Sequence, residues 1–434
     1  MNWSWIFRAV WMLCLGVNDM SREMKDSGVE WIGEIPKDWN VQRVKNAFVR
    51  KKAEAHQENP VVLSLARAGV KVRDLSKNEG QIAESYYNYN PVEFGDLLLN
   101  PMDLYSGANC SISMVEGVIS PAYINLRAKS GYSSRFYDYY FKTQYWSMAM
   151  FAHGKGVSFE NRWTLGIEEV FNYKIPVPLE DEQDKIAVFL DKRCEKIDQL
   201  IQKQQEYCEL LNQYKYSLYT EKAKKLNCKR TVLGRIVKNI EQGWSPAPAE
   251  RNEDGNWNVL TLAAVKYGEF TANETKCFNG SIEKCGNLSL KKGDFLLTRS
   301  NTRELVGQVC IVDEDMEKTI FSDLIYRITF DRRYVEPEYL KYYFQTAMMR
   351  QQISRDAHGS SSTMVKITHK DIKMWEVELP ALVEQKKYIN EMKKKTAIIN
   401  KLLNNHNQYT ELLKDYKKSL IYEYVTGKKE VPES

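Results

Sequence analysis

Two long segments of this chain carry apolar residues at alternating spacings of four and three positions, and neither contains glycine or proline. They run from Leu179 to Lys225 and from Ala381 to Thr426. This spacing is typical of a helix that buries one narrow stripe against a second helix. Each segment follows a proline and begins with acidic residues, which suit the positive end of the helix dipole. We therefore predict two long helices that end near Asn227 and Gly427 and pair as an antiparallel coiled coil.

The two apolar stripes are polar at the same two places. The first comprises Ile186, Leu190, Arg193, Ile197, Leu200, Gln204, Tyr207, Leu211, Tyr214 and Leu218, and the second comprises Tyr388, Met392, Lys395, Ile399, Leu402, His406, Tyr409, Leu413, Tyr416 and Leu420. A polar residue in such a stripe lowers stability but fixes the register of the helix pair. The arginine, glutamine, lysine and histidine are candidates for that role, unless their side chains turn outward to water.

The chain repeats itself at a fixed offset of 202 residues, as from Pro178 to Pro380. Identical residues at this offset are Glu182 and Glu384, Gln183 and Gln385, Lys185 and Lys387, Ile197 and Ile399, Leu200 and Leu402, Tyr207 and Tyr409, Leu211 and Leu413, Tyr214 and Tyr416, and Ser217 and Ser419. Solenoid repeats are far shorter, at roughly 20–50 residues, so we interpret the repeat as a duplicated domain plus helix. Two similar halves suit a partner with two-fold symmetry, of which duplex DNA is the commonest.

The segments before the long helices, 24–178 and 229–380, mix short strand-like runs with a few helices. The predicted runs are Val61–Leu65, Asp96–Leu99, Val118–Leu126, Val259–Leu262, Asp294–Thr298 and Phe321–Phe330. Matched positions are Leu63 and Leu260, Gly95-Asp96 and Gly293-Asp294, Tyr139-Tyr140-Phe141 and Tyr342-Tyr343-Phe344, and His153 and His358. Their offset drifts from 197 (260 minus 63) to 205 (358 minus 153). The two segments thus share their core elements but differ in their loops. Two domains that bind different DNA sequences would need this arrangement.

The composition has enough hydrophobic residues for buried cores, and its positive and negative charges nearly balance. Of 434 residues, 43% are hydrophobic, and 62 Lys and Arg against 57 Asp and Glu leave a charge of +5. A nucleic-acid surface must therefore be local. The eight cysteines form no Cys-x-x-Cys pair and have no histidine at zinc-finger spacing, so we expect a reduced, cytoplasmic setting without a metal site.

Residues 1–19 form an apolar stretch that is interrupted by Arg8 and is too short to span a bilayer. The stretch lacks the basic start and the cleavage site of a signal peptide. We interpret it as a non-native or disordered extension, with Met1, Met20 and Met24 as alternative starts. No membrane association is expected.

The motifs of several common enzyme classes are missing from the sequence. There is no G-x-x-x-x-G-K-[ST] phosphate loop, no G-x-S-x-G elbow and no H-E-x-x-H zinc motif. The string at residues 90–94, NPVEF, breaks the Asn/Asp-Pro-Pro-aromatic motif expected of an amino-nitrogen methyltransferase. His153 and His358 stand beside glycines without a cysteine or carboxylate at fixed spacing, so we interpret them as loop-fixing or DNA-facing. No catalytic residue is predicted.

Basic, amide and hydroxyl side chains gather in loops that differ between the halves, at 60–75, 100–110, 153–163, 299–304 and 358–370. Arginine forks read guanine, asparagine reads adenine, and hydroxyl or ammonium groups hold phosphates. The alternative for each loop is ordinary solvation. The candidate DNA-binding residues are Arg67, Lys71, Arg73, Tyr105, Ser106, Lys155, Asn161, Arg162, Arg299, Asn301, Arg303, Ser361, Ser362 and Lys366.

Several stretches resemble a known family. They are SGVEWIGEIPKDW (27–39), LSLARAGVKVRDLSKNEG (63–80) and the doubled PLEDEQDKIAVFLDKRCEKIDQLI and PALVEQKKYINEMKKKTAIINKLL. They resemble the specificity (S) subunits of type I restriction-modification systems over nearly the whole chain after Met20, most specifically in the doubled Pro-x-x-x-Glu-Gln. The extension before Met20 and a less acidic second helix depart from the family pattern, which puts the second helix's modification-subunit contacts in doubt.

The resemblance implies a subunit without catalysis or cofactors of its own that recognises a bipartite site in double-stranded DNA. In the family, two modification subunits bring S-adenosylmethionine and methylate adenine. Restriction subunits bring ATP-driven translocation and cleavage, with Mg²⁺. The long helices of the S subunit set the spacing between the half-sites.

We therefore expect an α/β protein with two similar mixed α/β target-recognition domains in a pseudo-twofold arrangement, joined by two long helices. The predicted divisions are an extension (1–19), recognition domain 1 (20–178), a central helix (179–228), recognition domain 2 (229–380), a C-terminal helix (381–427) and a tail (428–434). Two alternatives remain open. Methyl transfer or nicking by the chain alone would favour a fused enzyme, and a lack of sequence-dependent DNA binding would favour a coiled-coil adaptor that binds only protein.

Overall fold

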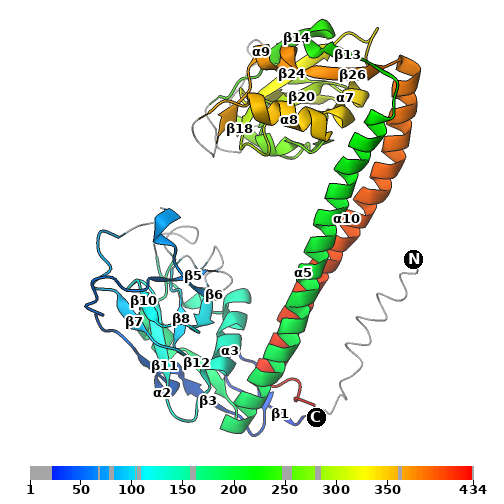
Figure 1. The fold of residues 1–434 in the computed structure, drawn as a ribbon. Coiled ribbons are helices and arrows are strands. Elements are labelled where there is room, and N and C mark those ends of the chain that lie inside the picture. Colours follow the sequence, from blue (N-terminus) through cyan, green and yellow to red (C-terminus); the bar gives the residue numbers. More distant parts are fainter. Residues whose placement is uncertain are drawn as a thin grey trace. The chain divides into compact units, whose positions relative to one another are not determined.

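The computed structural model describes residues 22–66, 69–77, 83–102, 104, 109–156, 163–246, 257–278, 285–359 and 364–432. The chain divides into two compact units. Unit 1 comprises residues 1–203 and 409–434, and unit 2 comprises residues 204–408. Each unit holds part of both long helices and one globular domain, called domain 1 and domain 2 below (Figure 1). Within the described ranges, no helix has the length and apolar character needed to cross a membrane.

The two predicted long helices are present, as α5 (Glu180–Lys224) and α10 (Leu382–Val425). They run antiparallel within each unit. In unit 1, Lys417 donates to Asp198 at 2.7 Å, and in unit 2, Lys215 donates to Asn400 at 3.4 Å. These two pairs are equivalent, because 417 minus 202 is 215 and 198 plus 202 is 400. The helix contacts therefore repeat at the offset seen in the sequence.

The predicted apolar stripes are only partly buried. The buried members are Ile186, Leu190, Ile197, Leu218, Tyr388, Met392, Ile399, Leu413 and Leu420. The prediction is wrong for Tyr207, Tyr214 and Leu402, whose side chains are exposed. A straight helix drifts by about 20° per heptad against a strict seven-residue repeat. In unit 2 the contacts accordingly pass to neighbouring positions such as Cys208, which donates to Asn407.

Of the four polar stripe positions, two lie within hydrogen-bonding distance of each other across the helices. Gln204 Oε1 and His406 Nδ1 lie 2.6 Å apart, and they are equivalents at the offset of 202. The Arg193 guanidinium lies over the ring of Phe189 on its own helix, and Lys395 bonds Glu391 one turn away. The Gln204–His406 pair is therefore the one that remains a candidate for fixing register.

The ends of the long helices differ from each other. α10 is followed by Gly427 with φ +71, a left-handed cap. α5 ends at Lys224, close to the predicted Asn227, which has no positive φ. The chain needs no such reversal at this point, since it passes directly into the strand that begins at Cys228.

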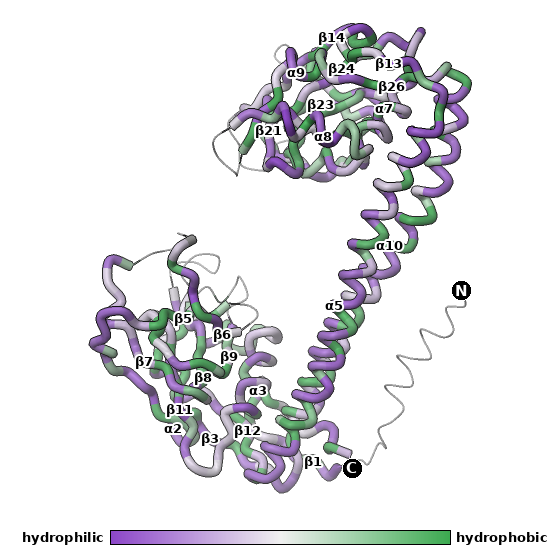
Figure 2. Tube along the Cα trace, in the orientation of Figure 1, coloured by the Kyte–Doolittle hydropathy of each residue, from purple (hydrophilic) through white to green (hydrophobic). Residues whose placement is uncertain are grey.

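Domain 1 is built on a four-stranded antiparallel sheet. Its elements are β1 (Met24–Asp26), β2 (Glu34–Pro36), β3 (Asn40–Arg43), α2 (Val44–Ala47), β4 (Phe48–Arg50), β5 (Leu63–Ala66), β6 (Gly69–Val72), β7 (Asn90–Val92), β8 (Leu97–Leu99), β9 (Cys110–Ile112), β10 (Gly117–Ile119), β11 (Ile124–Ala128), α3 (Ser134–Trp146), α4 (Ile167–Asn172) and β12 (Lys174–Val177). The sheet order is β4-β11-β8-β9, and the pairs β1-β2, β3-β12, β5-β6 and β7-β10 surround it. Figure 2 shows hydrophobic residues gathered along these central strands, where β8 is wholly buried.

Domain 2 repeats this frame with additions. Its elements are β13 (Cys228–Val232), β14 (Val237–Gln242), β15 (Trp257–Leu260), β16 (Val265–Lys266), β17 (Glu269–Phe270), β18 (Thr275–Phe278), β19 (Ser289–Leu290), β20 (Phe295–Thr298), β21 (Ser300–Asn301), β22 (Val309–Ile311), β23 (Met316–Phe321), β24 (Ile325–Phe330), α7 (Pro337–Tyr343), α8 (Ala347–Asp356), β25 (Val365–Lys366), α9 (His369–Met374) and β26 (Glu376–Pro380). The sheet β14-β24-β20-β22 matches the sheet of domain 1, and β13-β26 matches β3-β12. A second sheet, β18-β15-β23-β19, extends domain 2.

Two of the predicted strand-like runs are not single strands. The run Val118–Leu126 is broken between β10 and β11, and the run Phe321–Phe330 is broken between β23 and β24. The breaks are equivalent turns, closed by Tyr123 N–H to Ser120 O and by Ile325 N–H to Ser322 O, both at 3.0 Å. In the first, Pro121 has no N–H to offer a ladder.

A buried glutamine joins each long helix to its own domain. Gln183 Oε1 accepts from the Ser133 N–H (2.8 Å), and its amide donates to Gly131 O and Pro178 O. Gln385 repeats every bond, with Glu336 N–H (2.9 Å), Tyr334 O and Pro380 O. Both side chains are fully buried. The glutamine of the doubled Pro-x-x-x-Glu-Gln motif is thus a structural junction.

A second duplicated contact has its charges exchanged. In unit 1, Arg135 of α3 pairs with Asp191 of α5, whose carboxylate also accepts from Tyr139 at 2.7 Å. In unit 2, Glu338 of α7 pairs with Lys393 of α10 at 2.7 Å. The acid lies on the long helix in one unit and on the domain in the other.

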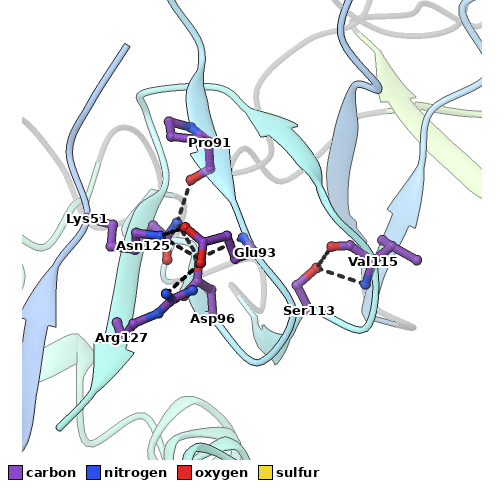
Figure 3. Close-up of polar contacts among 8 residues, drawn as sticks. All are labelled: Lys51, Pro91, Glu93, Asp96, Ser113, Val115, Asn125 and Arg127. Carbon is purple, nitrogen blue, oxygen red and sulfur yellow. Dashed lines mark hydrogen bonds and ion pairs between the residues drawn. The ribbon is translucent and has the colours of Figure 1, made fainter. Parts of the chain in front are cut away.

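The matched Gly-Asp pairs form an ion-pair turn in each domain. Asp96 is fully buried and accepts from the Glu93 N–H (2.8 Å) and from Arg127 of β11 (2.7 Å), while Lys51 and Arg127 both pair with Glu93 (Figure 3). In domain 2 the equivalent Asp294 accepts from the Lys291 N–H (3.0 Å) and from Arg327 of β24 (3.1 Å). The preceding glycines have φ of +85 and +92, which glycine adopts without strain. These motifs therefore hold the frame.

Removal of the junction glutamine should destabilise the protein. Gln385→Ala leaves the Glu336 N–H and two carbonyls buried without partners, so we expect a loss of about 2–4 kcal/mol in the free energy of unfolding. Gln199 is the matched control, because it is exposed on α5 and bonds only Glu195. Denaturant unfolding of both alanine variants checks this, and equal losses would contradict the junction role.

The ion-pair turn of domain 1 should make its stability depend on acid pH. Bonds from Lys51 and then Arg127 lower the pKa of Glu93 from 4.5 to about 2. A lowered pKa stabilises the fold above pH 4.5, and this contribution is lost as the pH falls towards 2. Glu93→Gln should therefore lower the melting temperature at pH 7 and flatten its decline between pH 4.5 and 2. The exposed Glu116→Gln of the same domain should leave both unchanged.

Candidate nucleic-acid interface

In domain 2 the structure brings two of the predicted loops together. β21 pairs with β25, with Ser300 opposite Lys366 and Asn301 opposite Val365. His358 forms a further bridge with Lys366. The loops 299–304 and 358–370, separated in sequence by more than fifty residues, thus form one surface, which we call patch 2. It carries the predicted residues Arg299, Asn301, Arg303 and Lys366.

The basic side chains of patch 2 differ in how firmly they are held. Arg299 is half-buried, donates to the Asp323 carbonyl at 3.3 Å and lies 5.8 Å from the ring centre of Tyr326. Its Nε is buried without a partner among the described residues. Arg303 donates to Ser354 O at 3.1 Å, while Lys366 is exposed. Arg299 and Arg303 are therefore positioned by the fold, which suits groups that must meet a ligand in a fixed geometry.

Patch 2 also contains His369, which the sequence did not single out, and His358, which it did. His369 packs its ring against Tyr326, with centroids 4.5 Å apart, and burial together with nearby Lys373 and Arg299 lowers its pKa. His358 Nε2 lies 3.5 Å from Asp371, whose carboxylate caps α9 through Thr368. His369 gave no signal in the sequence, because its place beside Tyr326 depends on the folded strands.

Domain 1 brings its predicted residues together less completely. Lys71 is exposed on β6, and the Arg73 N–H donates to Val62 O at 2.8 Å. Lys155 pairs with Glu169 of α4 at 2.5 Å, so this charge is engaged within the domain. Arg67, Tyr105, Ser106, Asn161, Arg162, Ser361 and Ser362 lie outside the described residues. The DNA-binding residues accordingly stay predictions.

The two matched histidines have different surroundings. His153 lies between two aromatic rings, with its centroid 4.7 Å from that of Trp31 and 5.2 Å from that of Tyr173. His358 is exposed on patch 2. His153 thus corresponds to the loop-fixing interpretation, and His358 stands where a ligand can reach it.

Comparison with known proteins gives one consistent family. Residues 233–412 match the family model "Type I restriction modification DNA specificity domain". The type I restriction enzyme MjaVIII specificity subunit of Methanocaldococcus jannaschii is 24% identical over 398 residues, which cover 80% of this chain and 86% of that protein. The EcoEI specificity subunit of Escherichia coli is 25% identical over 160 residues, which cover 36% of this chain and 27% of that protein.

A solved structure shows the same fold. It is described as "Structural basis underlying complex assembly and conformational transition of the type I R-M system", and it aligns over 90% of this chain and 98% of that chain. The TM-score is 0.62 at 15% sequence identity. The chain is thus similar to specificity subunits of type I restriction-modification systems over most of its length, and residues 233–412 match their DNA specificity domain. The resemblance in its sequence is therefore confirmed, and so is the expected α/β fold with two domains and two long helices. The match to the family model contains all of patch 2 that the structure describes.

Proposed function

We propose that this chain is a specificity subunit that reads a split site in double-stranded DNA, one half-site with each domain, and has no catalysis of its own. The observation that carries the proposal is the duplicated frame with unequal loops. The sheets β4-β11-β8-β9 and β14-β24-β20-β22 match, and so do the pairs β3-β12 and β13-β26, whereas among the described residues the strand pairs β16-β17 and β21-β25 occur in domain 2 alone. A shared frame with different loops suits two modules that bind the same kind of polymer at different sequences.

Patch 2 supplies the chemistry for one half-site. Guanidinium groups held in place, as in Arg299 and Arg303, suit bidentate reading of guanine, and Asn301 suits adenine. The exposed Lys366 suits a phosphate oxygen. Domain 1 would read the other half-site with the predicted loops 60–75, 100–110 and 153–163.

The long helices of unit 2 offer an apolar surface for a protein partner. This surface, the helix stripe, comprises Tyr207, Leu210, Tyr214, Ile398 and Leu402, which are 41–63% exposed. The α5 members follow one another at spacings of three and four, so they share one face. Tyr207 stacks on His406, one turn beyond Leu402, which joins the two helices into one surface. Exposed apolar side chains in such a row mark interaction sites.

In this proposal the helix stripe receives a modification subunit, and two such subunits join the complex. The modification subunits bring S-adenosylmethionine and methylate adenine, and restriction subunits bring ATP and Mg²⁺ for translocation and cleavage. The cytoplasm is the compartment in which these partners meet DNA. The chain itself supplies recognition and assembly.

The direct test is methylome sequencing of a host that lacks other methyltransferases and expresses this chain with its modification subunit. We expect a split methyl-adenine motif that is absent without the chain. Exchange of the loop 299–304 should change one half-site and leave the other half-site and the spacer untouched, because that loop belongs to domain 2. Simultaneous change of both half-sites would refute modular reading, and the lack of any motif from an assembled complex would favour a protein-binding adaptor.

The helix stripe has a test of its own. Leu210→Asp combined with Leu402→Asp should abolish co-purification of the modification subunit, since burial of two carboxylates in an apolar contact is strongly unfavourable. Gln205→Asp is the matched control, because Gln205 is exposed on another face of α5. Retained binding by the double variant, with an unchanged melting temperature, would rule out the stripe.

A further inference from the structure

A tight hairpin of domain 2 reaches both long helices. β16 and β17 pair across Tyr267 and Gly268, which have φ of +54 and +82. A two-residue loop in which both φ angles are positive is the shortest connection between the strands of a hairpin. Tyrosine adopts a positive φ only at a cost in backbone strain. The Tyr267 N–H donates to Gln308 Oε1 and the Gly268 N–H to Val309 O, each at 3.0 Å. The turn is thus held firmly against the body of domain 2.

Glu269, which follows the turn, contacts a residue from each helix. Asn400 of α10 donates to the Glu269 carboxylate at 2.7 Å, and the Lys215 ammonium of α5 lies 3.7 Å from it. Lys215 is only 3% exposed. Burial of an ammonium group without a partner is costly, and Glu269 and Asn400 are the polar partners of Lys215 there.

This contact lies beside the apolar junction between domain 2 and the helices. The apolar junction centres on Tyr219 of α5 and on Tyr388 and Met392 of α10, packed against Tyr342. Asn400 is twelve residues beyond Tyr388, which corresponds to about 18 Å along α10, while Lys215 is one turn from Tyr219 on α5. The contact thus widens the attachment of domain 2 along α10, and a wider attachment restricts the angle of the domain on the helices more than a narrow one.

The hairpin contact is polar and lies between two hollows. One hollow of ≈ 450 Å³ includes Asn212, Asn404 and Asn407 in its lining. The other, of ≈ 110 Å³, is lined by Gln345, whose buried Nε2 has no partner among the described residues. The ring of Tyr267 lies 6.3 Å from that of Tyr216 of α5, so the Glu269 carboxylate supplies the polar part of this contact.

We propose that Glu269 is a positioning residue that fixes the angle of domain 2 on the long helices and thereby restricts the spacer length between half-sites. This inference rests on the proposed function. Without the bridge, domain 2 pivots about the apolar junction and reaches its half-site at neighbouring spacings. The bases that it reads stay the same, since patch 2 is not part of the bridge.

The test is the methylome of the assembled complex with wild-type chain, Glu269→Ala and a charge exchange. In Glu269→Ala, we expect unchanged half-sites and an about tenfold higher methylated share at sites whose spacer is one base pair shorter or longer, which corresponds to about 1.4 kcal/mol. Glu269→Lys should broaden the spacer further, and adding Lys215→Glu should restore a single spacer. Glu274→Ala, at an exposed glutamate of the same domain, should retain it.

The outcomes separate the inference from the proposed function. A wild-type complex without a split motif would overturn the proposed function itself. A split motif whose spacer stays single in Glu269→Ala would overturn the positioning role, as would a changed half-site sequence. Melting temperatures of the purified chains show which variants fold. If Glu269→Ala fails to fold, Glu269→Gln, which keeps an acceptor for Asn400 but loses the charge, should broaden the spacer by a smaller factor.

Discussion

The architecture depends on one buried glutamine at the start of each long helix. Each amide satisfies a backbone N–H and two carbonyls where domain and helix meet, and burial makes the loss of any of these bonds costly. With the junctions of Gln183 and Gln385 fixed, the direction in which each helix leaves its domain is fixed as well. The paired helices then have a defined relation to the domain in each unit, which a measuring function requires.

Duplication is preserved in positions more than in residue types. The equivalent helix contacts are Asp198 with Lys417 in one unit and Lys215 with Asn400 in the other. The second of these pairs has gained Glu269 from the hairpin of domain 2. One inherited scaffold thus carries two domains whose attachment has diverged, in keeping with two half-sites that need not be related in sequence.

Much of the fold could be predicted from the sequence, because helices with a regular apolar period and a fixed repeat leave local signals. The rotation that exposes Tyr207 and Tyr214 could not, since it depends on how straight helices drift along each other. At the candidate site, Arg299 and Lys366 were predicted separately. Their proximity, and the place of His369, follow from the pairing of β21 with β25, which the sequence does not encode locally. Glu269 was missed because nothing in the local sequence distinguishes it from an ordinary surface glutamate. Its contacts with Lys215 and Asn400 form only when the chain has folded.

The exchanged charges at the junctions have a consequence for assembly. Two homologous domains on one chain risk docking on each other's helix while the chain folds. A wrongly docked α3 would bring Arg135 against Lys393, and a wrongly docked α7 would bring Glu338 against Asp191. Like charges face each other in both errors and opposite charges in the correct arrangement. The two ion pairs therefore favour docking of each domain on its own helix. They disfavour the misfolded arrangement in which a domain docks on the helix of the duplicate unit.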